Sequence, residues 1–66
     1  MDTKALKLEM KRAGLTQTMV AKELNMSSQA VSNKINGKSP ITVDEAVVIS
    51  RMLNLNPLRR SQIFLL

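Results

Sequence analysis

Apolar positions recur at helical spacing in five short segments of this chain, and each segment is bounded by residues that favour helix ends. In the first segment Leu6, Met10 and Ala13 form one apolar stripe. In the third, Val31 and Ile35 lie one helical turn apart. The pattern therefore predicts an all-α chain. The first expected helix begins after a cap at Asp2 or Thr3 and runs to about residue 12. The others cover residues 17–24, 28–36, about 43–53 and a short segment from residue 57 onward.

The helices at residues 17–24 and 28–36 should be joined by a tight turn. Ser, Thr, Asn and Asp side chains cap helix N-termini, and Thr16 and Ser27 each precede a helical pattern. These two caps are eleven positions apart, which leaves little room for a loop. Asn25 suits the turn because Asn tolerates the left-handed conformation.

Further end signals bound the other helices. Gly14 can take the left-handed position after the first helix, and Asn54 can end the fourth. Thr42 and Glu45 form a capping box, T-V-D-E, that sets the start of the fourth helix. Asn56-Pro57 supplies an N-cap followed by a proline at the first helical position, where its missing N–H costs nothing.

The helix at residues 28–36 carries an uncharged polar face. On a wheel of about 100° per residue, five polar side chains share an arc of roughly 140°. They are Ser28, Gln29, Ser32, Asn33 and Asn36. A helix in the DNA major groove needs short donors and acceptors at the base edges, and Gln or Asn can bond adenine bidentately. The alternative, a solvated face, more often carries Lys, Glu and Arg. The pattern therefore favours base reading.

Composition argues against catalysis. A chain of 66 residues with 44% hydrophobic content is expected to form one domain, near the lower size limit for a single core. It contains no Cys and no His, so thiolate metal sites are excluded and the commonest general base is missing. Only five carboxylates are present. We therefore expect no enzyme activity, no metal, no cofactor and no small-molecule substrate.

The chain also lacks the signals of membrane proteins. It has no apolar run of about 18 residues and no hydrophobic signal segment, which predicts a cytoplasmic protein. A basic helix on a membrane surface is a poor alternative, because the apolar positions are divided among five capped segments instead of one long amphipathic stretch.

The net charge of +5 is unevenly distributed. No carboxylate occurs from Leu24 to Val43, whereas Lys34 and Lys38 lie inside that window. This distribution favours a polyanionic partner, although small domains are often basic by chance. A second basic stripe lies on the first helix and is either a solvated face or a contact with flanking phosphates. Its members are Lys4, Lys7 and Lys11, with Arg12 beside them.

Residues 15–38 carry a motif of specific spacing. Its parts are Leu15-Thr16-Gln17, Ala21, Asn25, Val31-Ser32 and Asn36-Gly37-Lys38. At these positions the chain resembles the helix-turn-helix family of phage Cro and repressor proteins. The order S-x-K-I-N-G-K, followed by Ser39, Pro40 and Asp44-Glu45, is most similar to a small phage-encoded subgroup. The resemblance implies a compact five-helix, lambda-repressor-like domain over residues 1–66, with a double-stranded DNA operator as its partner.

Two residues depart from the family pattern. Asn25 stands where the family usually has Gly, and Lys34 stands at a normally apolar position, so Ile35 should take over that contact. We expect the Lys34 ammonium to extend outward along its aliphatic stem and reach a phosphate.

The resemblance also implies how individual residues meet DNA. Gln17, at a helix start, should contact a phosphate, although an ordinary polar helix start is the alternative. Lys38 and the backbone N–H groups of its loop could hold another phosphate. The expected DNA-binding residues are Gln17, Ser27, Ser28, Gln29, Ser32, Asn33, Lys34, Asn36 and Lys38.

A homodimer is expected because one recognition helix reads only a few base pairs. The fourth helix is apolar almost all round, and apolar residues beyond the needs of one small core follow it. The expected interface residues are Leu55, Pro57, Leu58 and Phe64. Alternatively, Phe64 and the terminal leucines pack in the core of their own chain instead of contacting a second copy. The interface would be small, so the dimer should be weak and form on DNA.

Two functions from different classes remain. The first is a sequence-specific transcriptional regulator that acts by operator occupancy, as a repressor or a Cro-like phage switch. The second is a protein-interaction module, such as an antitoxin or antirepressor, that uses the same fold. The uncharged arc on the third helix favours the first.

Overall fold

The computed structural model describes residues 1–65, and five α-helices account for most of them. Their bounds are α1 Thr3–Ala13, α2 Gln17–Leu24, α3 Ser28–Ile35, α4 Val43–Met52 and α5 Pro57–Phe64. No strand occurs in this part of the chain, so the predicted all-α fold is confirmed. Over residues 1–65, no helix has both the length and the apolar content needed to cross a bilayer.

The connections α1–α2, α2–α3 and α4–α5 contain the same three-residue motif. The three copies are Gly14-Leu15-Thr16, Asn25-Met26-Ser27 and Asn54-Leu55-Asn56. The first residue of each copy has a positive φ, of 67°, 55° and 56° respectively. The N–H of the second residue donates back across the helix end, at 2.9 Å each time. The third residue caps the next helix with its side chain. Each motif therefore ends one helix and starts the next with almost no free loop.

The middle residue of each motif is apolar and turns inward. Leu15 is buried, and Met26 and Leu55 are half-buried against the core. The sequence placed Ala13 on the apolar stripe of the first helix, but Ala13 is exposed, so that prediction was wrong. The chain turns at Gly14 directly after Ala13, and Leu15 takes the buried position that the helical pattern had assigned to Ala13.

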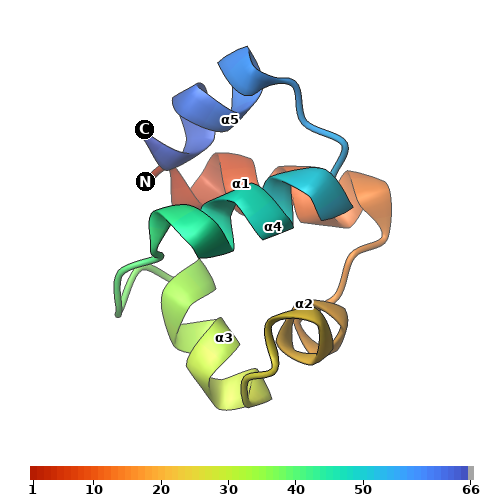
Figure 1. Ribbon diagram of the computed structural model, residues 1–66, viewed down its shortest axis with the longest axis vertical. Helices are drawn as coiled ribbons and strands as arrows, with labels where there is room; N and C mark the ends of the chain where they lie inside the picture. The colour runs from red at the N-terminus through yellow and green to blue at the C-terminus, as the bar shows by residue number, and fades with distance from the viewer. Residues whose placement is uncertain (66) are drawn as a thin grey trace.

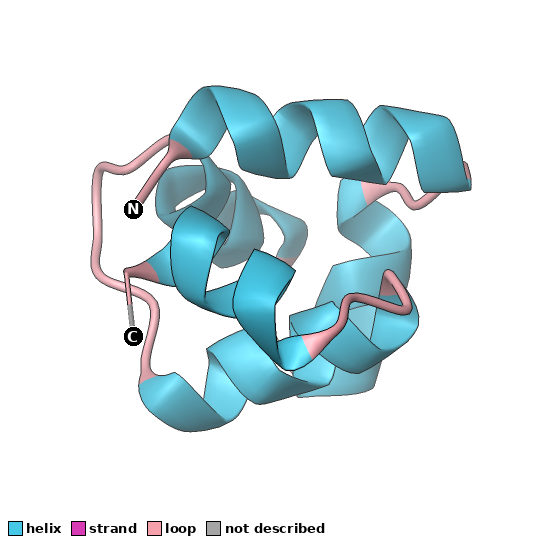
Figure 2. Cartoon of the chain, turned by 90° about the horizontal axis from the view of Figure 1, so that it is seen from above, coloured by secondary structure: helices cyan, strands magenta, loops and turns pink. Residues whose placement is uncertain are grey.

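Every helix contributes one of the five largest fully buried side chains. These are Leu6, Val20, Val31, Ile49 and Ile63. α1 and α4 lie in the middle of the molecule, with α2 and α3 at one end and α5 at the other (Figure 1). Seen from above, α5 lies between α1 and α4 (Figure 2). All five helices therefore share one core.

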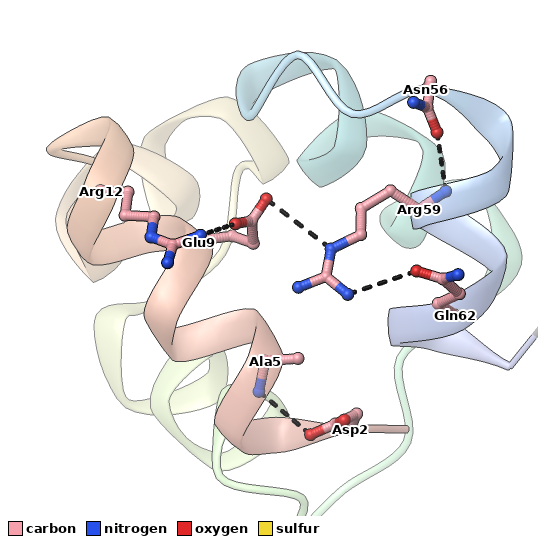
Figure 3. Close-up of polar contacts among 7 residues, drawn as sticks. All are labelled: Asp2, Ala5, Glu9, Arg12, Asn56, Arg59 and Gln62. Carbon is pink, nitrogen blue, oxygen red and sulfur yellow. Dashed lines mark hydrogen bonds and ion pairs between the residues drawn. The ribbon is translucent and has the colours of Figure 1, made fainter.

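Polar contacts tie α5 to α1. The backbone N–H of Asp2 donates to the Ile63 carbonyl at 2.7 Å. The carboxylate of Glu9 lies 3.5 Å from Arg12 on its own helix and 4.0 Å from Arg59 of α5 (Figure 3). The Glu9 side chain is 17% exposed, whereas those of Arg12 and Arg59 are 68% and 36% exposed, so both pairs lie at the protein surface.

Burial on α4 and α5 is less uniform than the sequence suggests. Ser50 is buried and donates its hydroxyl to the Ala46 carbonyl at 2.7 Å, whereas Val43 is 60% exposed. On α5, Phe64 is buried and belongs to the core. Of its two predicted roles, core packing is therefore the one observed, and not an exposed interface position. Leu65 is 71% exposed, and Leu66 lies outside the described residues.

Candidate nucleic-acid interface

α2 and α3 pack closely and are separated by the Asn25 turn. Ala21 is 5% exposed, and its small side chain lets the two helices approach each other. Thr16 accepts a hydrogen bond from the Met19 N–H at 3.2 Å, and Ser27 accepts one from the Ala30 N–H at 3.1 Å. Both predicted N-caps and the predicted left-handed turn at Asn25 are therefore confirmed.

α3 has one buried side and one polar side. Val31 and Ile35 are buried, and Ile35 takes the core contact expected of it. The five polar residues of the predicted arc lie beside this buried stripe on the helix wheel. Of these, Ser28, Gln29 and Asn36 are exposed, and Ser32 and Asn33 are half-buried. The structure thus exposes three residues of the uncharged face and partly covers the other two.

Hydrogen bonds within this face hold its amides in place. Gln29 donates from Nε2 to Asn33 Oδ1 at 3.2 Å, and Asn36 donates from Nδ2 to the Ser32 carbonyl at 2.8 Å. Gln29 keeps its carbonyl oxygen as an acceptor, and Asn33 keeps its NH₂ as a donor. An acceptor and a donor side by side are what the major-groove edge of adenine requires. The bond between Gln29 and Asn33 joins the two amides in the free protein.

The α3–α4 loop differs from its predicted role in one respect. The N–H groups of Lys38 and Ser39 both donate to the Asn33 carbonyl, at 2.8 and 3.3 Å. These donors end α3 and are not free to hold a phosphate, as the sequence suggested they could be. The exposed Lys38 side chain remains available. On α2, Gln17 is exposed at the first helical position, where backbone N–H groups lack partners within the helix.

Lys34 is the clearest correction among the predicted site residues. Its ammonium donates to the Glu45 carboxylate and to the Pro40 carbonyl, both at 2.9 Å, and its side chain is 17% exposed. The predicted path outward to a phosphate is therefore not the one observed. Glu45 caps α4 beside the end of α3, so it offers a fixed partner within reach of the lysine. The bonds from Lys34 fasten the loop to both helices.

This contact changes the acidity of Glu45. Burial alone would raise the pKa of its carboxyl, but the hydrogen bond from the Thr42 N–H and the contact with Lys34 outweigh burial and lower the pKa from its ordinary value of 4.5. A lowered pKa contributes stability above the unfolded-state value, and that contribution is lost as pH falls through the folded-state value. Glu45 should therefore help to destabilise the fold in acid.

We expect Lys34→Met and Glu45→Gln each to lower the free energy of unfolding by about 1 kcal/mol. Gln at position 45 can still serve the capping box, so this variant isolates the charge. Urea unfolding of both single variants and the double variant should give a coupling energy of about 1 kcal/mol at about pH 7, and less at about pH 3. Lys38→Met is the exposed control and should change little. Additive losses at both pH values would contradict a stabilising pair.

The expected dimer residues fall into two groups. Phe64 is buried and Leu55 is half-buried, and both pack in or against the core. Pro57 is exposed and Leu58 is 70% exposed at the start of α5. Of these four residues, only Pro57 and Leu58 are therefore exposed apolar residues.

Two lysines of the predicted α1 stripe lie beside the α2–α3 motif. Lys7 and Lys11 of α1 line an open hollow of about 390 Å³, together with Gln17 of α2 and Asn36 at the end of α3. The sequence shows a stripe of lysines on α1, but it does not show which of them face the α2–α3 motif.

Comparison with known proteins agrees with this geometry. The helix-turn-helix family matches residues 6–59, which include α2, α3 and α4 entirely. No curated protein and no solved structure gives a significant match to the chain. The chain belongs to the helix-turn-helix family. This is a family of DNA-binding transcription regulators and not of enzymes, and double-stranded DNA is the partner that membership indicates.

Proposed function

We propose that this protein is a transcriptional repressor or Cro-like switch of phage origin that acts by occupying a DNA operator. The proposal places α3 in the major groove and assigns base reading to its uncharged face. Gln17 and Lys38 contact phosphates on either side, and the domain covers residues 1–66. As part of this proposal we assign the protein to the cytoplasm, where the operator of a phage regulator would lie.

The observation that carries the proposal is the hydrogen-bonded amide pair Gln29 and Asn33. Solvated helix faces usually carry charges, whereas this face carries none among its five arc residues. The single lysine at the end of α3 is turned away and neutralised by Glu45. The remaining donors and acceptors suit base edges, and exposed Lys38 supplies charge at the rim.

Selection of binding sites from random double-stranded DNA tests this function. We expect enrichment of an imperfect palindrome whose half-sites are about 10 base pairs apart. Binding should weaken steeply with salt, because each neutralised phosphate contributes about −0.9 to the slope of log K against log salt. If no sequence were enriched, the protein-interaction function of an antitoxin or antirepressor would replace this proposal.

Gln29→Ala should weaken binding to the enriched site by roughly 1–3 kcal/mol and relax the preference at one base pair. Asn33→Ala should relax the preference at the same pair, because the two amides act together. Gln62→Ala is the matched control, since Gln62 is exposed on α5 at the other end of the molecule. Competition binding against all single-base variants of the site gives the measurement. Unchanged preference in both folded α3 variants would count against base reading by this pair.

A further inference from the structure

One carboxylate decides where the cation of α3 points. Lys34 is the single charged residue of α3. Its ammonium donates to Glu45 Oε1 and to the Pro40 carbonyl, both at 2.9 Å, and its side chain is 17% exposed. A lysine ammonium has three N–H donors, so these two bonds use most of its capacity inside the protein. Lys34 therefore offers little charge to an outside partner.

The Glu45 carboxylate is held in place by contacts other than Lys34. Its Oε1 atom also accepts a hydrogen bond from the Thr42 N–H at 2.9 Å, and the Thr42 hydroxyl accepts one from the Glu45 N–H at 3.2 Å. This capping box sets the carboxylate at the start of α4, beside the end of α3. An anion that is already positioned competes well against an anion arriving from solution.

Lys34 is nevertheless close to the proposed DNA-binding surface. Pro40, which accepts one of its hydrogen bonds, lies two residues after Lys38 in the α3–α4 loop. Lys38 is exposed and is a phosphate contact in the proposed function. The lysine stem is long and flexible. Without Glu45, the Lys34 ammonium can therefore turn toward the stretch of DNA backbone that Lys38 contacts.

We propose that Glu45 limits sequence-independent binding to DNA by withholding Lys34 from the phosphates. The proposal rests on the DNA-binding function above. It makes Glu45 a positioning residue, which acts through Lys34 and contacts no DNA itself. Binding to unrelated sequences depends almost entirely on the number of phosphates neutralised. Withholding one cation therefore lowers the affinity for every competing site, while the uncharged face of α3 still acts at the operator.

The experiment measures affinity for a duplex of unrelated sequence over a series of salt concentrations. Glu45→Gln should steepen the slope of log K against log salt by about 0.9, which corresponds to one added phosphate contact. At about 0.1 M salt this is a gain of about eightfold, if the contact is worth nothing at about 1 M. Lys34→Met should keep the wild-type slope, because its charge is already withheld. The double variant should also keep it.

The residue before Glu45 provides a matched control. Asp44 lies in the same first turn of α4 and is exposed, and no ion pair among residues 1–65 includes it. Asp44→Asn removes the same charge without releasing Lys34, so the slope should stay close to that of the wild type. Circular dichroism melting confirms that each variant is folded at the temperature of the titrations.

Three results would overturn the inference and leave the proposed function standing. A wild-type slope in folded Glu45→Gln would mean that a released Lys34 finds no phosphate. Equal steepening by Asp44→Asn would mean that the general field of α4 is responsible. Steepening that persisted in the double variant would mean that the added contact does not come from Lys34. If the wild-type protein bound no duplex at all, the inference and the proposed function would both be wrong.

Discussion

Replacing Leu6 with Ala should leave this domain only marginally folded. Leu6 is fully buried and is one of the five side chains, one from each helix, at the centre of the core. Removal of a buried Leu side chain to Ala costs about 2.7–5 kcal/mol when the cavity cannot collapse. A domain of this size has a free energy of unfolding of about 3–10 kcal/mol, at 0.05–0.15 kcal/mol per residue. One substitution can therefore remove half or more of the total stability.

Urea and thermal unfolding followed by circular dichroism give the measurement. For a domain this small, each kcal/mol shifts Tm by about 4–8 °C, so we expect a fall of more than about 10 °C. Leu8→Ala is the control on the same helix, since Leu8 is 45% exposed, and it should cost much less. Operator DNA should partly restore the Tm of Leu6→Ala, because it binds only the folded state. Similar losses in the two variants would show that burial does not decide stability here.

Local signals explain why the helices could be predicted from the sequence. The ends depend on residues that act within a few positions of each other, as Gly14, Asn25 and the Thr42–Glu45 box do. Every predicted boundary consequently lies within one residue of the observed one. The uncharged arc on α3 was also predictable, since only helical periodicity is needed to find it.

Long-range packing explains what the sequence did not reveal. Lys34 could be placed on the protein side of α3, but its partner Glu45 lies eleven positions away on another helix. Periodicity within one helix carries no information about such a pair. The same limit applies to the lysines of α1, because the hollow beside Lys7 and Lys11 exists only once α2 and α3 are in place. Phe64 could not be assigned to core or interface for the same reason.

The dimensions of the molecule bear on its proposed dimer. Two recognition helices in successive major grooves lie about 34 Å apart. The Cα atoms span 28 × 22 × 20 Å, so two copies side by side on DNA can touch only over a small surface. A small interface would give a weak dimer that is populated mainly on the operator. The exposed apolar residues at the α4–α5 corner, Pro57 and Leu58, are our candidates for that interface.

Leu58→Asp should weaken binding to a full palindromic operator by about 100-fold, because the second copy no longer gains from contact with the first. The fold should survive, since Leu58 is 70% exposed and lies in the first turn of α5, where a carboxylate favours the helix dipole. Binding to a single half-site should be unchanged, which makes the half-site duplex the internal control. Leu58→Gln removes the apolar contact without adding charge and should lose cooperativity to a smaller extent. Mobility-shift titrations of both duplexes with the wild-type protein and both variants separate the half-site affinity from the cooperativity between two copies. If the Leu58→Asp protein bound the full operator with wild-type affinity and cooperativity, the dimer contact would have to lie elsewhere on the molecule.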